Sequence, residues 1–394
     1  MSYNIAGEGG FRPNGLSKGA LLLASMLILM GAAAVAPSLN GIEEEFGAGK
    51  FLTSMIITLP ALSVALFGFP MGSFADRIGM ARTFMLSLAV FSVFGVAGYF
   101  ADSIWFLLVT RFVIGIGIAG ISTSTTALIG MYYSGEERKR VIGMQSAFMG
   151  VGCVCLEIAG GILADIAWNV PFLIYAIGVP ILLLASYGIR DVRPRSFDDG
   201  GMERQEMPHR RSVMALCYVA IFVAMFVMFT IPVNMSDYLT RMDVSMTLCG
   251  IVLAIMGTAQ AVVSSLYARS KRRMGIASVF LLGFLLQAVS LCLLHLENFP
   301  VTCIAIMLCG MAMGIMVPTI VSTLSMASPA GSEGKVMGIY SMVMNLGSFC
   351  SALVVDALIE SLDFADAFLY VGIAAAAFAV AAALFGSRMN KKAV

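Results

Sequence analysis

The chain has 394 residues, of which 59% are hydrophobic and only 12% are charged, and its formal net charge is +1. A soluble domain has about 25% charged residues, because its surface must remain hydrated. The composition therefore excludes an ordinary soluble protein, gives no sign of a nucleic-acid partner, and favours a surface that faces lipid.

Apolar runs follow one another along almost the whole chain. A helix that crosses a bilayer needs about 20 mostly apolar residues, and twelve runs meet this requirement. They cover residues 16–40, 51–74, 83–101, 104–131, 141–165, 170–189, 212–236, 247–268, 276–296, 301–326, 336–360 and 365–386. The first run has no obvious cleavage site, so we expect no cleavable signal. Twelve spans place both termini on the same side of the membrane.

Lysine and arginine are distributed very unevenly between the two sides. With the N-terminus in the cytoplasm, the cytoplasmic segments hold 21 basic residues, whereas the outer loops hold only Lys50 and Arg241. Such a bias is what the positive-inside rule describes. It predicts a multi-pass protein of the plasma (inner) membrane with both termini in the cytoplasm. One further basic residue, Arg111, lies inside the fourth span.

A polar stretch in the middle of the chain separates six spans from six. Residues 195 positions apart match in several spans, for example Gly115 with Gly310 and Gly152 with Gly347. Repeats of this kind are typical of transporters, whose solute site lies between the two halves. We therefore predict an all-α membrane protein built from two pseudo-symmetric six-helix bundles. The predicted parts are an N-terminal bundle (1–190), a cytoplasmic linker (191–211) and a C-terminal bundle (212–394).

The loop after the second span carries a compact motif, Gly-Ser-Phe-Ala-Asp-Arg-Ile-Gly-Met-Ala-Arg. Its key residues are Gly72, Asp76, Arg77, Gly79 and Arg82. The motif resembles the signature G-x-x-x-D-R-x-G-R-R of the major facilitator superfamily, in the loop where that family carries it. Gly79 permits a tight turn, and Asp76 offers a carboxylate to helix N-termini across the interface. The resemblance implies a latch between the cytoplasmic faces of the two halves in one access state.

The fourth span begins a second pattern at Arg111. The run Arg-Phe-Val-Ile-Gly-Ile-Gly is similar to R-x-x-q-G-x-g of the same superfamily, whose arginine is linked to proton coupling in the drug:proton antiporter branch. The resemblance therefore gives Arg111 a role in coupling. A charge inside a membrane is costly, so it normally faces a cavity or a partner.

Glu157 in the fifth span is the main departure from the family pattern. The antiporter signature g-x-x-x-G-P-x-x-G-G matches Gly152, Gly160 and Gly161, but Leu156 and Glu157 replace its Gly-Pro. Glu157 and Arg111 lie at similar depths, so three interpretations are open. They form a static pair, they form a pair that protonation of Glu157 releases, or they face separate environments. Asp356, near the outer end of the eleventh span, is either an interfacial acid or a further coupling group.

Polar residues gather on spans that line the central cavity in this superfamily. The candidates are Ser122, Thr126, Thr230, Asn234, Thr319, Ser322 and Thr323, with Gln260 and Asn345 on other spans. Hydroxyl groups in membrane helices also bond to their own backbone. The group as a whole therefore carries more weight than any single member.

No phosphate-binding loop, dinucleotide fingerprint or metal-ligand spacing occurs in the sequence, and the eight cysteines all lie in apolar runs. We expect no enzyme activity, no cofactor and no metal. The expected function is secondary active transport of a small apolar or amphipathic solute by alternating access, with proton-coupled efflux as the best hypothesis. A uniporter or proton symporter for a small organic anion is the alternative. The expected partners are the solute, a proton and the lipid bilayer, and we expect a monomer.

Overall fold

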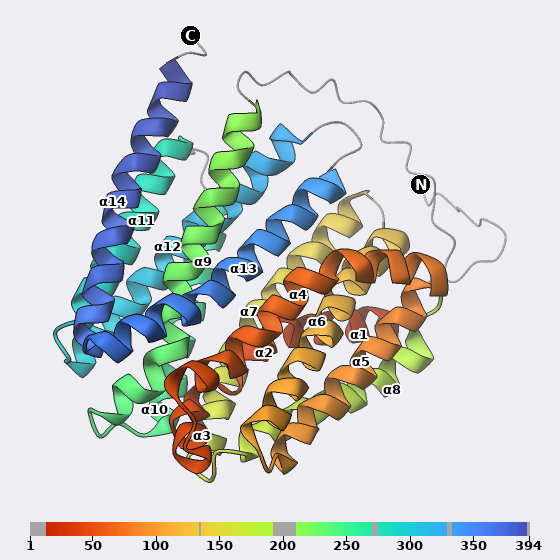
Figure 1. Ribbon diagram of the computed structural model, residues 1–394. Coiled ribbons are helices and arrows are strands. Elements are labelled where there is room, and N and C mark those ends of the chain that lie inside the picture. The colour runs from red at the N-terminus through yellow and green to blue at the C-terminus, as the bar shows by residue number, and fades with distance from the viewer. Residues whose placement is uncertain (1–12, 134, 192–209, 270–274, 329–332, 392–394) are drawn as a thin grey trace.

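The computed structural model describes residues 13–133, 135–191, 210–269, 275–328 and 333–391, and these residues form helices and short connections (Figure 1). Within this described part, eleven helical segments are long and apolar enough to cross a membrane. They correspond to the second to twelfth predicted spans. They are α4 (Lys50–Ile78), α5 (Met80–Ala97) with η3 (Gly98–Phe100), α6 (Ile104–Tyr132), α7 (Gly135–Ala164), η4 (Val170–Ile177) with α8 (Gly178–Gly188), α9 (Arg210–Thr240), α10 (Met246–Arg269), α11 (Ile276–Leu294), α12 (Phe299–Ala327), α13 (Glu333–Ser361) and α14 (Phe364–Lys391).

The first predicted span differs, because it is a series of short helices rather than one continuous helix. These are α1 (Gly15–Met26), η1 (Leu27–Leu29), α2 (Met30–Ala33), η2 (Ala36–Ser38) and α3 (Leu39–Phe46). Pro37 lies in this series, and a proline has no backbone N–H to continue a helix. The Tyr175 hydroxyl donates a hydrogen bond of 3.2 Å to the carbonyl of Met30 at the start of α2, and this bond ties the interrupted span to η4.

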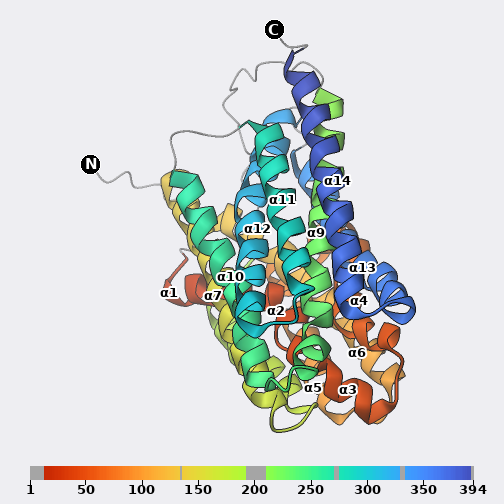
Figure 2. The same cartoon turned by 90° about the vertical axis from the view of Figure 1, so that its left-hand side faces the viewer.

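The helices form two halves, which we call the first half (α1 to α8) and the second half (α9 to α14) (Figures 1 and 2). The halves meet along two pairs of helices, α4 with α13 and α7 with α10. Glycines allow the backbones of α7 and α10 to approach closely. A Cβ on Gly250 would overlap the carbonyl oxygen of Glu157, and a Cβ on Gly161 would overlap that of Met246. The interface between the halves is therefore closely packed where these glycines lie.

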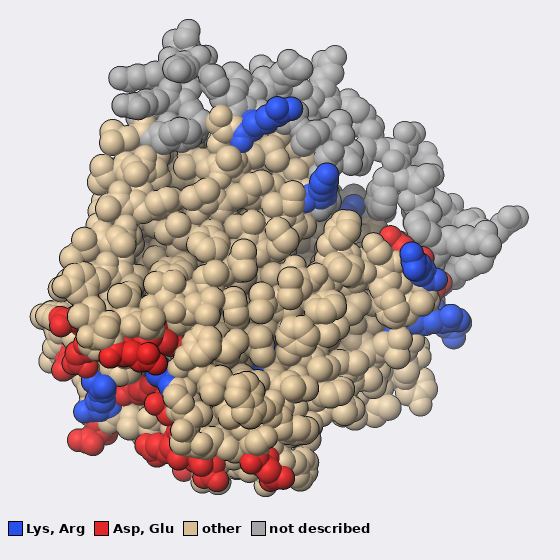
Figure 3. Space-filling model, in the orientation of Figure 1, with Lys and Arg blue, Asp and Glu red and all other residues tan. Residues whose placement is uncertain are grey.

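The two ends of the molecule carry opposite charges. Asp and Glu gather along the lower edge in the view of Figure 3, whereas Lys and Arg lie mostly toward the upper edge. We call the lower end, formed by residues 41–50, 98–103, 165–170, 237–246, 295–299 and 361–364, the acidic end. The opposite end, with residues 77–82, 132–133, 135–140 and 188–191, is the basic end.

Candidate functional site

Arg111 on α6 is completely buried inside the first half. Its guanidinium carbon lies 4.7 Å from the ring centre of Phe172 and 4.9 Å from that of Tyr175. Its Nη2 atom donates hydrogen bonds of 3.4 Å and 3.3 Å to the carbonyl oxygens of Phe94 and Gly95. Aromatic faces and carbonyl dipoles thus replace part of the water that a buried cation loses.

Glu157 on α7 lies at the interface with the second half. Its side chain is 5% exposed, and its Oε1 atom accepts a hydrogen bond of 3.5 Å from the Cys153 thiol. Its Oε2 atom is buried without a hydrogen-bond partner. That atom lies 3.8 Å from the position that a Cβ on Gly257 of α10 would take. The carboxyl group therefore faces α10.

Arg111 and Glu157 do not form a pair. In the part of the chain that the structure describes, Arg111 contacts aromatic rings and backbone carbonyls of its own half, and Glu157 bonds only to a thiol. The two interpretations that paired these residues are therefore wrong for this conformation, and the third, separate environments, agrees with the structure. Similar depth did not imply contact, because the two side chains leave their helices in different directions.

Asp356 on α13 is also buried between the halves, with a side chain that is 1% exposed. Its electrostatic neighbours in the first half include Ser54 and Lys50 on α4 and Glu43 on α3. The Ser54 hydroxyl does not reach hydrogen-bond geometry, so Ser54 Oγ and both Asp356 oxygens are buried without partners. Asp356 is therefore an interface residue and does not extend to the membrane surface.

Hydrogen bonds and an ion pair join the two halves at the acidic end. Lys50 on α4 pairs with Asp237 on α9. The Ser236 hydroxyl donates to the carbonyl of Pro37 over 2.9 Å. Asp165, just after α7, accepts from the backbone N–H groups of Met246 and Thr247 over 2.8 and 3.0 Å, at the first turn of α10. These contacts close the acidic end.

The loop motif after the second span lies at the basic end. Gly79 has φ +100°, and a Cβ there would overlap the Asp191 carboxylate, so the turn requires glycine. Asp191 Oδ1 accepts a 2.7 Å hydrogen bond from the N–H of Ala81 and thereby caps α5. The side chains of Asp76, Arg77 and Arg82 are exposed. A Cβ added to Gly72 would contact only the methyl group of Thr123. Among the described residues, Asp76 has no hydrogen-bond or ion-pair partner in this conformation.

The predicted cavity residues differ in accessibility and mostly bond to their own helices. Thr230 and Asn234 on α9 are fully buried, and Thr319 on α12 is nearly so. The half-buried ones are Ser122, Gln260, Ser322, Thr323 and Asn345, and Thr126 is exposed. Carbonyl groups three or four residues earlier accept hydrogen bonds from Thr126, Thr230, Asn234, Thr319, Ser322, Thr323 and Asn345. The amide oxygen of Asn234 is buried without a partner.

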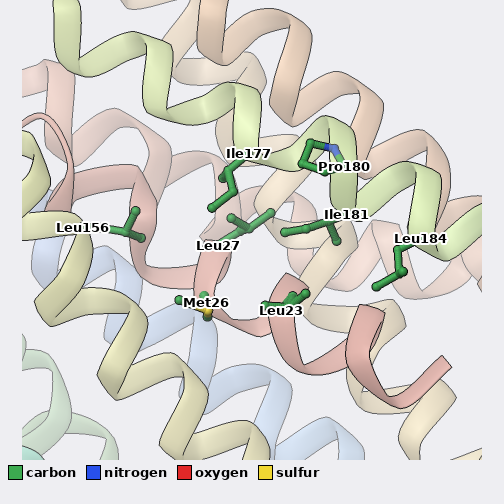
Figure 4. Close-up of a pocket in the computed structure, with 8 residues that line it drawn as sticks. All are labelled: Leu23, Met26, Leu27, Leu156, Ile177, Pro180, Ile181 and Leu184. Atoms are coloured by element: carbon green, nitrogen blue, oxygen red, sulfur yellow. The ribbon is translucent and has the colours of Figure 1, made fainter. Parts of the chain in front are cut away.

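Two apolar pockets flank α7. One, of about 350 Å³, lies beside the break in the first span (Figure 4). It is lined by Leu23, Met26, Leu27, Leu156, Ile177, Pro180, Ile181 and Leu184. The other, of about 580 Å³, lies between α7, α10 and α12 and includes Met307 and Met311. Every residue that lines the first pocket is apolar, so it offers no group for a charged ligand.

Sequence reasoning missed several residues that the structure brings into the site. Tyr175 links Arg111 to the break in the first span, and Asp165 caps a helix of the opposite half. Lys50 and Asp237 pair across the halves. The available signal was Lys50, which is one of only two basic residues in the predicted outer loops.

Comparison with known proteins identifies the family. The family model described as Major Facilitator Superfamily matches residues 21–278 and 217–394. The chain is similar to the class C tetracycline resistance protein of Escherichia coli, with 25% identity over 351 residues that cover 84% of this chain and 86% of that protein. It is also similar to the multidrug efflux protein YfmO of Bacillus subtilis (strain 168), with 30% identity over 165 residues, or 42% of this chain and 40% of the relative.

Among solved structures, a POT family transporter in complex with 5-aminolevulinic acid has a TM-score of 0.78 at 14% identity, covering 97% of this chain and 98% of that chain. The matched family consists of membrane transporters rather than enzymes. The chain therefore belongs to the Major Facilitator Superfamily and has its all-helical fold.

Proposed function

We propose that this protein is a proton-coupled secondary transporter that exports a small apolar or amphipathic solute by alternating access. The observation that carries the proposal is Glu157, a carboxyl group buried at the interface of the halves without a cationic partner. A carboxylate in such a place is costly, whereas a protonated carboxyl group is not. Relatives that are named for tetracycline resistance and multidrug efflux support export.

The proposed location is the inner membrane, with the basic end and both termini in the cytoplasm. The acidic end then faces outward, and the contacts that close it give an inward-facing state. We propose that the protein acts as a monomer and divides at residues 191–211, most of which lie outside the described residues. The motif with Gly72, Asp76, Arg77, Gly79 and Arg82 would latch the basic end in the opposite state, which is consistent with an exposed Asp76 here.

Glu157 takes a proton as α7 and α10 come together. Protonation removes the charge, so the carboxyl group can be enclosed beside Gly257. Loss of the proton requires that water or solute reach the carboxyl group, and this requires the helices to separate. Proton and solute therefore favour different packings of the same helices, which is the requirement for exchange. The solute pathway runs past the partly accessible polar residues of α6 and α12, such as Ser122 and Ser322.

Arg111 is proposed to position helices rather than to bind solute. It is enclosed by Phe172, Tyr175 and the carbonyl groups of α5, and Tyr175 in turn bonds to Met30 at the break in the first span. A substrate anion would have to displace these groups to reach it. The arrangement therefore favours efflux of an apolar or amphipathic solute over carriage of an organic anion.

Proton movement in everted membrane vesicles tests the proposal. Vesicles with an acidic interior, monitored by the quenching of a pH-sensitive dye, would receive tetracycline, ethidium or benzoate. We expect tetracycline or ethidium to release protons from vesicles that contain the transporter, and not from vesicles that contain the Glu157→Gln variant. Proton uptake into the vesicles with benzoate, and no proton release by tetracycline or ethidium, would favour the anion symporter instead, and no response to any amphipathic compound in a broad panel would reject exchange.

A further inference from the structure

The acidic end contains a group of charges, one fully buried and three partly buried, that neither the family motifs nor the Glu157 proposal uses. It consists of Glu43 on α3, Lys50 on α4, Asp237 on α9 and Asp356 on α13. Two members come from each half, so the group exists only while the acidic end is closed. We call it the gate cluster.

The gate cluster has fewer cations than carboxyl groups. Lys50 pairs with Asp237 and lies 5.2 Å from the ring centre of Phe364, and its electrostatic neighbours include Asp356 and Glu43. One lysine cannot neutralise three carboxylates. Arg241 does not supply the missing charge, because it pairs with Asp363 at the surface over 2.7 Å.

The oxygen atoms of the cluster are also short of hydrogen-bond donors. Both oxygens of Asp356, Oε2 of Glu43 and Oδ1 of Asp237 are buried without partners. Glu360, one turn further along α13, adds a second negative neighbour to Asp356. Buried polar atoms nearly always have partners, so such a concentration of unpartnered acceptors indicates a ligand that donates hydrogen bonds or carries positive charge. Within the described residues, no group of three or more acidic, histidine or cysteine side chains has the arrangement of a metal site.

We propose that Asp356 is a proton-binding site of the outer gate, separate from Glu157, and that its protonation closes the acidic end. A proton on Asp356 cancels the charge that Lys50 cannot reach, and it turns one unpartnered acceptor into a donor. Loss of the proton restores a carboxylate that only water can satisfy, so the halves separate at α4 and α13. The inference rests on the proposed function insofar as the gate belongs to a transporter, but it does not depend on the solute or on Glu157.

Hydrogen exchange of the full-length transporter in lipid nanodiscs, followed by mass spectrometry, tests the site without a solute. Peptides that cover residues 39–54, 236–247 and 352–363 report on the gate, after correction for the intrinsic pH dependence of amide exchange. We expect their exchange to rise by about tenfold per pH unit above a threshold, because one linked proton changes the closed-to-open equilibrium by that factor. Glu157 also takes a proton as the halves come together, so Asp356→Asn is tested in the Glu157→Gln background, where it should remove this dependence and keep the gate protected at every pH.

Three further measurements separate the site from its rivals. Glu157→Gln should retain the pH dependence, and its loss there would assign the gate proton to Glu157 and overturn the inference while leaving the proposed function intact. Glu43→Gln, which removes a negative neighbour from the cluster, should move opening to lower pH, because the Asp356 carboxylate is then opposed by one charge fewer. An unchanged pH dependence when Asp356→Asn is combined with Glu157→Gln, no pH dependence in the wild type, or opening controlled by sodium at constant pH would each overturn the proposal.

Discussion

The interior of the first half and the interface between the halves differ in how far buried charge is compensated. Inside the first half, Arg111 is surrounded by two aromatic rings and two carbonyl groups, and only its Nη1 atom is buried without a hydrogen-bond partner. At the interface, Glu157 and Asp356 keep oxygen atoms without any partner. Groups within one half move together, so a charge there can be compensated permanently. A charge between halves that separate cannot be, and its compensation must arrive and leave with a small ligand such as a proton.

The largest expected effect comes from blocking the interface itself. Gly250→Leu places a side chain where Gly250 now meets the carbonyl oxygen of Glu157, and this backbone atom cannot move aside. We expect transport in vesicles to be abolished, with the acidic end held open. Gly143→Leu on α7 is the matched control, because Gly143 is exposed and no atom lies within 4 Å of the position that its Cβ would take. Normal transport by Gly250→Leu would show that close packing of α7 on α10 is dispensable.

The second largest effect is expected from removing the positive charge of Arg111. Arg111→Ala deprives Phe172 and Tyr175 of their cation and removes the guanidinium donor from the carbonyl groups of Phe94 and Gly95. Together with the cavity, this should cost about 3 kcal/mol of stability. Thermal unfolding of the purified protein would measure the loss, and transport should fall with it. Arg140→Ala, at an exposed site of the basic end, should change neither. An unchanged unfolding temperature in Arg111→Ala would contradict the positioning role.

Removing the carboxyl group of Glu157, which has no cationic partner, should affect coupling rather than stability. Glu157→Gln replaces a carboxyl group that has no cationic partner by a neutral group of the same shape, so thermal stability should be kept or slightly increased. Transport driven by a proton gradient should be lost, while exchange of solute for solute across the membrane continues. Glu137→Gln, an exposed acid at the basic end, controls for the change of charge. Normal accumulation by Glu157→Gln would remove this residue from the coupling mechanism.

The helices of the fold could be predicted from sequence, because lipid requires long apolar segments whose backbone is satisfied internally. Eleven spans correspond to predicted ones. The break in the first span was not predicted, although Pro37 was a visible reason for it. A proline in a membrane helix either bends the helix or ends it, and the outcome depends on contacts with other helices. Here the Tyr175 hydroxyl, 145 positions away in the chain, donates to the carbonyl of Met30 in the interrupted span.

For the candidate site, the sequence indicated how deep each charged residue lies in the membrane. It did not indicate in which direction the side chain leaves its helix. The positions of Arg111 and Glu157 along their helices suggested contact, yet one faces α5 and η4 and the other faces α10. Helices that are apolar on all sides give no periodic signal for the direction of a single charged residue. The gate cluster escaped notice for another reason. Lys50 was counted as a rare basic residue of an outer loop, whereas its carboxylate partners come from three separate segments that only the fold brings together.

The smallest expected effect concerns the contacts that hold the acidic end without buried charge. Asp165 is exposed and caps the first turn of α10 across the interface, where the N–H groups of Met246 and Thr247 point at it. Asp165→Ala removes a charged helix cap, which is worth about 1 kcal/mol. A change of that size shifts the ratio of closed to open acidic ends by about fivefold, so transport should continue with altered solute affinity.

Hydrogen exchange in the first turn of α10 would show the shift, and Asp102→Ala, an exposed acid at the same end, should leave it unchanged. The size of the effect is the decisive point. If Asp165→Ala abolished transport as completely as Gly250→Leu, the acidic end would depend on this surface cap rather than on glycine packing and the buried carboxyl groups. Closure of the acidic end would then depend on a single exposed carboxylate, and the contrast between a permanently compensated interior and a reversibly compensated interface would not explain it.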